Sequence, residues 1–130
     1  MIRVVLDTNI IVSALLQPLG PPAQAFLLVL GGAVQMCVSS AVFRRPRFSR
    51  TEETILAALE TIRANACWVQ PSEPVQACSD PDDDILLECS QAGGADYLVT
   101  GNVRDFPLRW LGTEVVTPRH FLDVIAETGR

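Results

Sequence analysis

The sequence predicts an α/β fold, a three-layer α/β/α sandwich around a central, mostly parallel sheet of about five strands. Short apolar runs alternate along the chain with helix-length segments, which is the pattern of βαβ units. The runs are almost continuously apolar, as in strands that are buried on both faces. The chain has 130 residues, 48% of them hydrophobic and 19% charged, so we expect residues 1–130 to form one compact domain.

The chain begins with a predicted strand and two predicted helices. Ile2–Leu6 is a short apolar run that suits a buried strand, and Ile10–Leu16 follows it as a helix. Prolines and a glycine in Gln17–Pro22 predict a loop. Ala23–Leu30 is the next predicted helix, because the glycine pair at 31–32 ends it.

Two further strands flank the longest helix. Val34–Val38 and Cys67–Val69 are the predicted strands. Between them, Thr51–Ala64 is the strongest helix prediction, because Ser49 and Glu52 have the spacing of a capping box and apolar residues recur on one face.

The second half of the chain continues the alternation. Asp80-Pro81 places an N-cap residue before a proline at the first helical position, and the glycine pair at 93–94 ends that helix. Tyr97–Thr100 and Val115–Thr117 are predicted strands, and a last helix follows the second of them through Ile125.

Composition excludes several classes of protein. The most apolar stretch, Ala25–Val34, contains two glycines and is shorter than the ~20 residues of a membrane span. The first residues lack the features of a signal peptide, so we expect a cytoplasmic protein with no membrane partner. A net charge of -5 argues against binding nucleic acid through an overall positive field, but it allows a nuclease with an acidic metal site.

The cysteines do not suggest a metal site. There is no C-x-x-C pair, and the single histidine, His120, is far from the cysteines in the sequence, which argues against zinc. In a reducing compartment we expect the thiols to be small buried apolar groups. They are Cys37, Cys67, Cys78 and Cys89.

Acidic residues gather where the predicted strands end. Asp7 directly follows the first strand, four aspartates crowd the helix start at 80–84, and Asp105 lies five residues after Thr100. Because ligands of an open parallel sheet bind beyond the carboxyl ends of its strands, we expect these carboxylates at one edge. Their repulsion favours a divalent cation, and oxygen ligands favour Mg²⁺ or Mn²⁺.

Each carboxylate also has a purely structural interpretation. Asp7 and Asp80 are both suited to cap the helices that follow them. Asp82 and Asp84 would complement the positive end of the helix dipole. For Asp105 the alternative is a hydrogen bond to the backbone of a local turn.

Asp83 is distinguished by the residues that share its helix face. Leu86, Leu87 and Ser90 follow it at i+3, i+4 and i+7, so the face below the carboxylate is largely apolar. This spacing predicts that Asp83 points along the core-facing side of the helix toward the sheet edge.

Missing residues argue against other folds with acidic sites. Response-receiver domains and haloacid-dehalogenase-type phosphatases place a lysine in the site, and this chain contains none. The second class also needs aspartate where Asn9 stands. The dinucleotide-binding motif G-x-G-x-x-G and the hydrolase motif G-x-S-x-G are absent.

Five segments, in order along nearly the whole chain, resemble those of a known family. They are Val4-Val5-Leu6-Asp7-Thr8-Asn9-Ile10, Arg44-Arg45-Pro46-Arg47-Phe48, Asp80-Pro81-Asp82-Asp83-Asp84, Ala95-Asp96-Tyr97-Leu98-Val99-Thr100-Gly101-Asn102 and Thr117-Pro118-Arg119-His120-Phe121-Leu122. The family is that of PIN domains, and the branch is that of the toxin components of prokaryotic toxin–antitoxin systems.

The resemblance implies an endoribonuclease that depends on Mg²⁺ or Mn²⁺ and cleaves RNA phosphodiesters with metal-activated water. By motif position, Asp7, Asp83 and Asp105 would hold the metal and carry catalysis, and Asn102 stands where the family often has aspartate. Other polar side chains would orient the carboxylates and the water. These are Thr8, Asn9, Thr100 and Asn102.

The resemblance also implies an RNA substrate and an antitoxin partner, and it leaves open whether the protein is a homodimer. Four of the seven residues at 44–50 are arginines, and guanidinium groups bind phosphate or carboxylate in a bidentate way. We therefore predict that Arg44, Arg45 and Arg47 contact RNA or an acidic antitoxin segment. The alternative is a solvated loop.

The sequence departs from the family after the second strand. The family normally has a helix with a glutamate ligand there, but Ser40 is followed almost at once by the arginine segment, so about two turns of helix are missing. Glu52 and Glu53 begin the next helix and are weak substitutes. The alternative function is therefore a catalytically impaired PIN scaffold that binds RNA or a protein partner without cleavage.

We expect the natural protein to carry additional residues between about Ser40 and Val42, including an acid that faces Asp7 and Asp83, because each lost ligand weakens the binding of a hard cation. The intact mass of protein purified from its natural source should then exceed 14.1 kDa. A mass near that value would refute this expectation, and weak metal binding with poor RNA cleavage would be expected instead.

Overall fold

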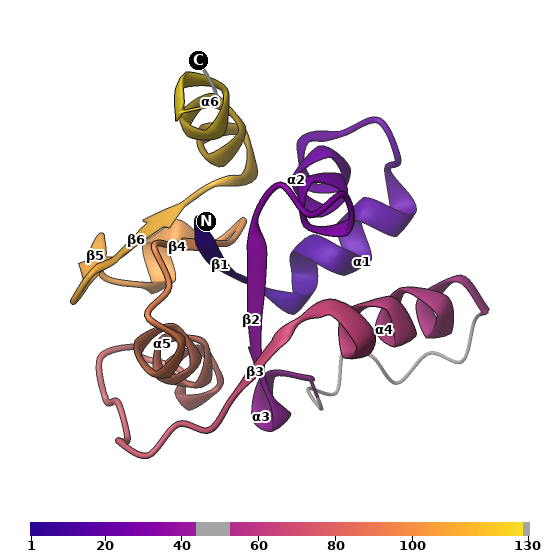
Figure 1. Ribbon diagram of the computed structural model, residues 1–130. Coiled ribbons are helices and arrows are strands. Elements are labelled where there is room, and N and C mark those ends of the chain that lie inside the picture. Colours follow the sequence, from indigo (N-terminus) through magenta and orange to yellow (C-terminus); the bar gives the residue numbers. More distant parts are fainter. Residues whose placement is uncertain (44–52, 129–130) are drawn as a thin grey trace.

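The computed structural model of the protein, which describes residues 1–43 and 53–128, has a central six-stranded sheet between helices (Figure 1). The strands are β1 (Arg3–Leu6), β2 (Gln35–Ser39), β3 (Cys67–Val69), β4 (Tyr97–Val99), β5 (Arg109–Trp110) and β6 (Thr113–Val116). Their order is β3-β2-β1-β4-β6-β5, and only the β5–β6 pair is antiparallel. The predicted α/β class with a mostly parallel sheet is confirmed.

Helices cover both faces of this sheet. They are α1 (Thr8–Leu16), α2 (Pro21–Leu30), α3 (Ser40–Phe43), α4 (Glu53–Asn65), α5 (Pro81–Gly93) and α6 (Pro118–Thr128). On one face α5 packs against β1, β2, β3 and β4, and α1, α2 and α6 form a contiguous group on the opposite side (Figure 1). The helix α4 contacts α1.

The structure adds elements that periodicity did not predict. The strand β5 has two residues and forms a hairpin with β6, and α3 has four residues. Elements this short contain hardly more than one repeat of a hydrophobic pattern, so the pattern could not reveal them. The proposed capping box at Ser49 and Glu52 lies outside the described residues.

The core lies where β1 and β4 run through the middle of the sheet. The side chains of Val4, Val5, Leu6, Leu98 and Val99 are completely buried. Because all strands except β5 run in the same direction, their carboxyl ends meet at one edge. The core therefore presents the residues that follow β1, β2, β4 and β6 at that edge.

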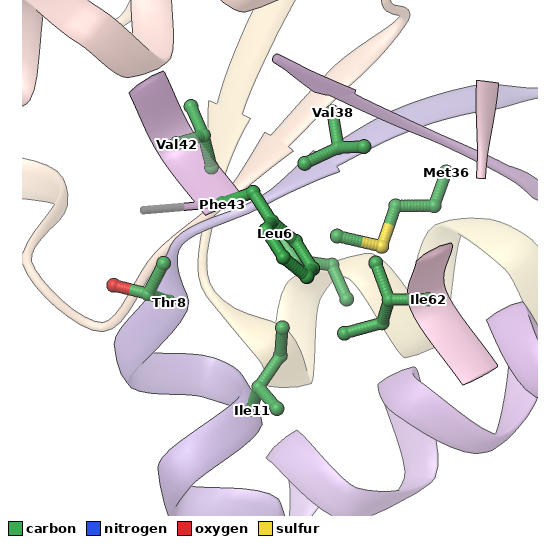
Figure 2. Close-up of a pocket in the computed structure, with 8 residues that line it drawn as sticks. All are labelled: Leu6, Thr8, Ile11, Met36, Val38, Val42, Phe43 and Ile62. Carbon is green, nitrogen blue, oxygen red and sulfur yellow. The ribbon is translucent and has the colours of Figure 1, made fainter. Parts of the chain in front are cut away.

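A small apolar cavity lies beneath this edge, between the sheet and the helices α1, α3 and α4 (Figure 2). Its volume of about 10 Å³ is at the lower limit of what one water molecule needs. Leu6 and Val38 line it from the sheet, and Ile11 and Ile62 line it from α1 and α4. Thr8 also borders it, but its hydroxyl oxygen points away from the apolar side chains (Figure 2). The side chains that line this cavity therefore pack the start of α1 against the sheet.

Among the described residues, no single helix is long and apolar enough to span a membrane. Only α1 and α2 taken together reach the length and hydropathy of a membrane span, and the chain bends by 109° between them.

Gly93 allows α5 to approach β2 closely. A Cβ atom at this position would lie 3.0 Å from both Cβ and Sγ of Cys37 and 3.5 Å from Cγ1 of Val69. Cys37 is completely buried on a strand with neighbours on both sides, so it has little freedom to move away.

Gly93→Ala should therefore lower the free energy of unfolding by about 1–2 kcal/mol, because overpacking outweighs the better helix propensity of alanine. Chemical denaturation would measure the change. Gly112→Ala is the matched control, since a Cβ atom at position 112 would meet no heavy atom within 4 Å and the backbone φ there is not positive. A Gly93→Ala protein as stable as the wild type would contradict the packing argument.

Candidate active site at the carboxyl edge of the sheet

Asp7 is a buried carboxylate at the end of β1. Its side chain is only 2% exposed, and its backbone N–H donates to the carbonyl oxygen of Val99 at 2.9 Å. One carboxylate oxygen, Oδ1, accepts from the backbone N–H of Asn9 at 3.2 Å and caps α1. The other, Oδ2, accepts from the hydroxyl of Thr100 at 2.9 Å. The cap interpretation is therefore correct, but the cap uses only one of the two oxygens.

Thr100 connects two loops at this edge. Its hydroxyl donates to Asp7 and accepts from the backbone N–H of Asn102 at 3.1 Å. Thr100 is completely buried, whereas Asn102 is exposed. The hydrogen bonds therefore run from the loop after β4, through a buried hydroxyl, to the carboxylate after β1. They bring together three of the predicted site residues, although Asn102 takes part through its backbone.

Thr8 has a buried hydroxyl that lacks a hydrogen-bond partner in the described part of the chain. The residue is 1% exposed and follows Asp7 directly. An unsatisfied buried polar group costs about 1–3 kcal/mol, so its retention beside a carboxylate suggests a site for a polar ligand or an ordered water.

The start of α5 uses its aspartates in different ways. Asp80 caps the helix, and its Oδ1 accepts from the backbone N–H of Asp82 at 2.9 Å, as predicted. Asp84 is 6% exposed, and its Oδ1 accepts from the backbone N–H groups of Ala77 and Cys78 at 3.0 and 2.8 Å. Asp84 therefore does more than complement the helix dipole, because it also holds the preceding loop.

Asp83 lies at the start of the predicted helix face and is half-buried. Leu86, Leu87 and Ser90 on that face are completely buried, in agreement with the spacing in the sequence. Asp83 therefore lies at the end of the buried face of α5, where that face reaches the protein surface.

Cys78 lies within electrostatic range of both Asp83 and Asp105. Burial raises the pKa of the Cys78 thiol to about 12, with further contributions from the hydrogen-bonded Asp84 and from the charges of Asp83 and Asp105. Asp105 ends the short 3-10 helix η2 (Val103–Asp105) and is exposed. The loop before α5 thus lies within electrostatic range of both predicted acids.

Cys78 was not among the predicted site residues, because all four cysteines were expected to be core residues. Its position two residues before the N-cap Asp80, in the loop that leads to the acidic helix start, was the available signal.

The predicted site offers the oxygen donors that a hard cation prefers, but its carboxylates are not grouped around one point. Carboxylate oxygens are the ligands that Mg²⁺ and Mn²⁺ prefer, and a carboxylate oxygen that accepts a hydrogen bond, as both oxygens of Asp7 do, can also bind a cation. However, the described residues contain no group of three or more His, Cys, Asp or Glu side chains that could hold a metal ion. Asp7, Asp83 and Asp105 are therefore chemically suitable, but they do not form a closed site.

Several predicted residues lie outside the described part of the chain. These are Arg44, Arg45, Arg47 and Glu52, and the side chain of Glu53 is also not described. Their predicted roles stay predictions.

A surface cleft of about 270 Å³ lies between α1 and the starts of α2 and α6. Asn9, Ser13, Gly101 and Arg119 are among the residues that line it. Arg119 is exposed and places a positive charge next to the loop that follows β4. The surface that lines the cleft is mostly apolar, and Arg119 is its charged residue.

Comparisons with known proteins agree with this architecture. A family model described as PIN domain matches residues 3–104. The uncharacterized protein MJ1680 of Methanocaldococcus jannaschii is 23% identical over 141 aligned positions, which cover 94% of this chain and 90% of that protein. A chain in the crystal structure of VapBC2 from Rickettsia felis, bound to a DNA fragment from their promoter, has a TM-score of 0.60 and 15% identity, with 89% of this chain and 98% of that chain covered.

Thr100→Val should lower the free energy of unfolding by about 1–3 kcal/mol, because it removes the hydrogen bond to a buried carboxylate while keeping the shape of the side chain. Thr61→Val is the matched control, since the hydroxyl of Thr61 donates to Ala57 on an exposed helix surface, and its loss should cost less than about 0.5 kcal/mol. Equal losses in the two variants, measured by urea denaturation, would show that Thr100 does not support Asp7.

Proposed function

Because the chain belongs to the PIN-domain family, we propose that it is an endoribonuclease that depends on Mg²⁺ or Mn²⁺ and acts as the toxin of a toxin–antitoxin pair. The observation that carries this proposal is the environment of Asp7. A buried carboxylate stands at the carboxyl edge of a parallel sheet, with both oxygens oriented by hydrogen bonds and an unsatisfied hydroxyl next to it in the sequence. Such an edge is where ligands of open α/β sheets bind.

Asp7, Asp83 and Asp105 are the proposed metal ligands and catalytic acids. A divalent cation bound there would lower the pKa of a bound water and neutralise charge on the transferring phosphate. Asp7 is held rigidly, whereas Asp83 is half-buried and Asp105 is exposed. The proposed site therefore combines one fixed carboxylate with two that solvent and substrate can reach.

The surrounding residues have proposed roles that follow from their contacts. Thr100 holds Oδ2 of Asp7 with its hydroxyl, and the backbone of Asn9 holds Oδ1, so both keep the carboxylate in one orientation. Asn102 fixes Thr100 from the loop after β4. The hydroxyl of Thr8, which has no hydrogen-bond partner among the described residues, is suited to hold a water or a phosphate oxygen.

The substrate and partners remain part of the proposal. With a net charge of -5, the chain needs local positive groups to bind RNA, and the cleft beside Asn9 provides Arg119. We keep Arg44, Arg45 and Arg47 as proposed contacts to RNA phosphate or to an acidic antitoxin segment, acting in the cytoplasm. The structural likeness to VapBC2 supports a chain that works with an antitoxin protein.

A second candidate function is a PIN scaffold that binds RNA or a protein without cleavage. The absence of a three-residue metal group within the described residues favours it. The alignment with MJ1680 extends over 141 positions, more than the 130 residues of this chain, so that protein has residues without a counterpart here. This agrees with a segment missing relative to other members, although it does not locate the segment.

Cleavage of single-stranded RNA should require Mg²⁺ or Mn²⁺ and should stop when EDTA is added. Asp7→Asn and Asp83→Asn should each reduce the rate roughly 100-fold or more, because each removes a charge at the proposed site. Asp123→Asn, an exposed position on α6, is the matched control and should leave the rate unchanged. A gel assay with labelled RNA measures these rates.

Circular dichroism of each variant would separate loss of activity from loss of folding. RNA cleavage that persists in EDTA or in Asp7→Asn would exclude the proposed chemistry. RNA binding without any cleavage by the folded wild-type chain would favour the scaffold function.

A further inference from the structure

Two cysteines face each other across the parallel strands β2 and β3. Cys37 and Cys67 are partners in the strand register, so both side chains point to the same face of the sheet. Paired strands lie about 4.8 Å apart, which is within the Cα separation of about 4.4–6.8 Å that disulfides need. The two thiols are close enough to share a hydrogen bond, and both are free thiols in this structure.

Arg3 places a positive charge between these thiols. Its guanidinium Nη2 donates to Sγ of Cys67 at 3.2 Å. Its Nε is buried and lacks a hydrogen-bond partner among the described residues. Burial raises the pKa of the Cys37 thiol, and the hydrogen bond and charge of Arg3 act in the opposite direction. Arg3 therefore offers a counter-charge where a thiolate would form.

The two cysteines differ in their access to solvent. Cys67 is half-buried at the first residue of β3, whereas Cys37 is completely buried against Gly93. A small oxidant therefore reaches Cys67 first. A third thiol nearby, Cys89, is completely buried, and burial raises its pKa to about 12, which keeps it protonated.

We propose that Cys37 and Cys67 form a reversible disulfide when the protein meets hydrogen peroxide or a related peroxide. The sulfur of Cys67 attacks one peroxide oxygen, the O–O bond breaks, and the departing hydroxide takes up the thiol proton as water, which leaves a sulfenic acid on Cys67. The sulfur of Cys37 then attacks the sulfur of Cys67, and the S–O bond breaks. Hydroxide leaves with the proton of Cys37 as a second water.

The disulfide would join the edge strand β3 covalently to β2. β3 is the last strand in the order and is paired with β2, and the chain between Cys37 and Cys67 contains α3 and α4. Cross-linking its two ends restricts the unfolded chain and keeps α4 close to the sheet. This inference does not depend on the proposed nuclease activity.

Peptide mapping after peroxide treatment would test the proposal. The chain contains no lysine, so trypsin places Cys37 on peptide 4–44 and Cys67 on peptide 64–104. A second digestion with chymotrypsin, which cleaves after Trp68, separates Cys67 from the other two cysteines of that peptide. We expect one linked product, between Cys37 and Cys67, which dithiothreitol reverses, and a higher denaturation midpoint for the oxidised protein.

Two variants test the roles of the individual residues. Cys37→Ala should leave a sulfenic acid on Cys67 that dimedone labels. Arg3→Gln should slow formation of the link roughly threefold to tenfold. Arg109→Gln is its matched control, because that exposed arginine pairs with Glu114 at the far end of the sheet, and it should not change the rate.

Three results would overturn the proposal. They are a link that involves Cys78 or Cys89, irreversible oxidation of Cys67 without a link, and no reaction at peroxide concentrations that oxidise a free cysteine. If Arg3→Gln does not fold, the dimedone label on Cys67 in Cys37→Ala still decides whether Cys67 reacts first.

Discussion

The hydrogen bond between Asp7 and Thr100 is the interaction on which the edge of the sheet depends. A carboxylate that is 2% exposed is costly to bury unless its oxygens are hydrogen-bonded. The parallel register pairs Leu6 with Val99, so the next residue of each strand is brought to the same place. Thr100 can then donate to Asp7, and the loop after β4 follows through Asn102. The strand register therefore determines both the position of the loop after β4 and the orientation of the Asp7 carboxylate. The proposed chemistry requires that this orientation is kept.

The remaining acids divide according to what they bind. Asp80 and Asp84 accept backbone N–H groups and shape the start of α5 and the loop before it, so their charge is already used by the protein. Asp83 and Asp105 are more accessible, and both act on the electrostatic environment of Cys78. A cation at this edge would therefore have to draw on Asp83 and Asp105 as well as on the fixed Asp7. This division explains why acidic residues are abundant here although the described residues form no closed metal site.

The hydrophobic repeat predicted the five longer strands and the main helices, and Gly or Pro also marked the ends of α2 and α5. These sequence patterns also located Asp7, which directly follows a strand, and the Asp80 cap. They could not predict that Asp84 would be buried, since this depends on the loop at 77–78 folding back to donate two N–H groups. The same loop brings Cys78 to the acids, and the two-residue strand β5 is visible only through its pairing with β6. Contacts between distant segments decide these features.

The residues of α3, which follow β2, illustrate that the fold and a metal site make different demands on the sequence. The chain leaves the sheet through α3, where the backbone N–H of Val42 donates to Oγ of Ser39 at 3.2 Å and the Val42 side chain is almost fully buried. The four residues of α3 therefore follow the strand directly and add Val42 to the core. A metal site has a stricter requirement, because the affinity for a hard cation depends on the number of oxygen ligands around it. Packing and cation affinity therefore depend on different side chains, and the loss of an acidic ligand would weaken cation binding without changing the burial of Val42.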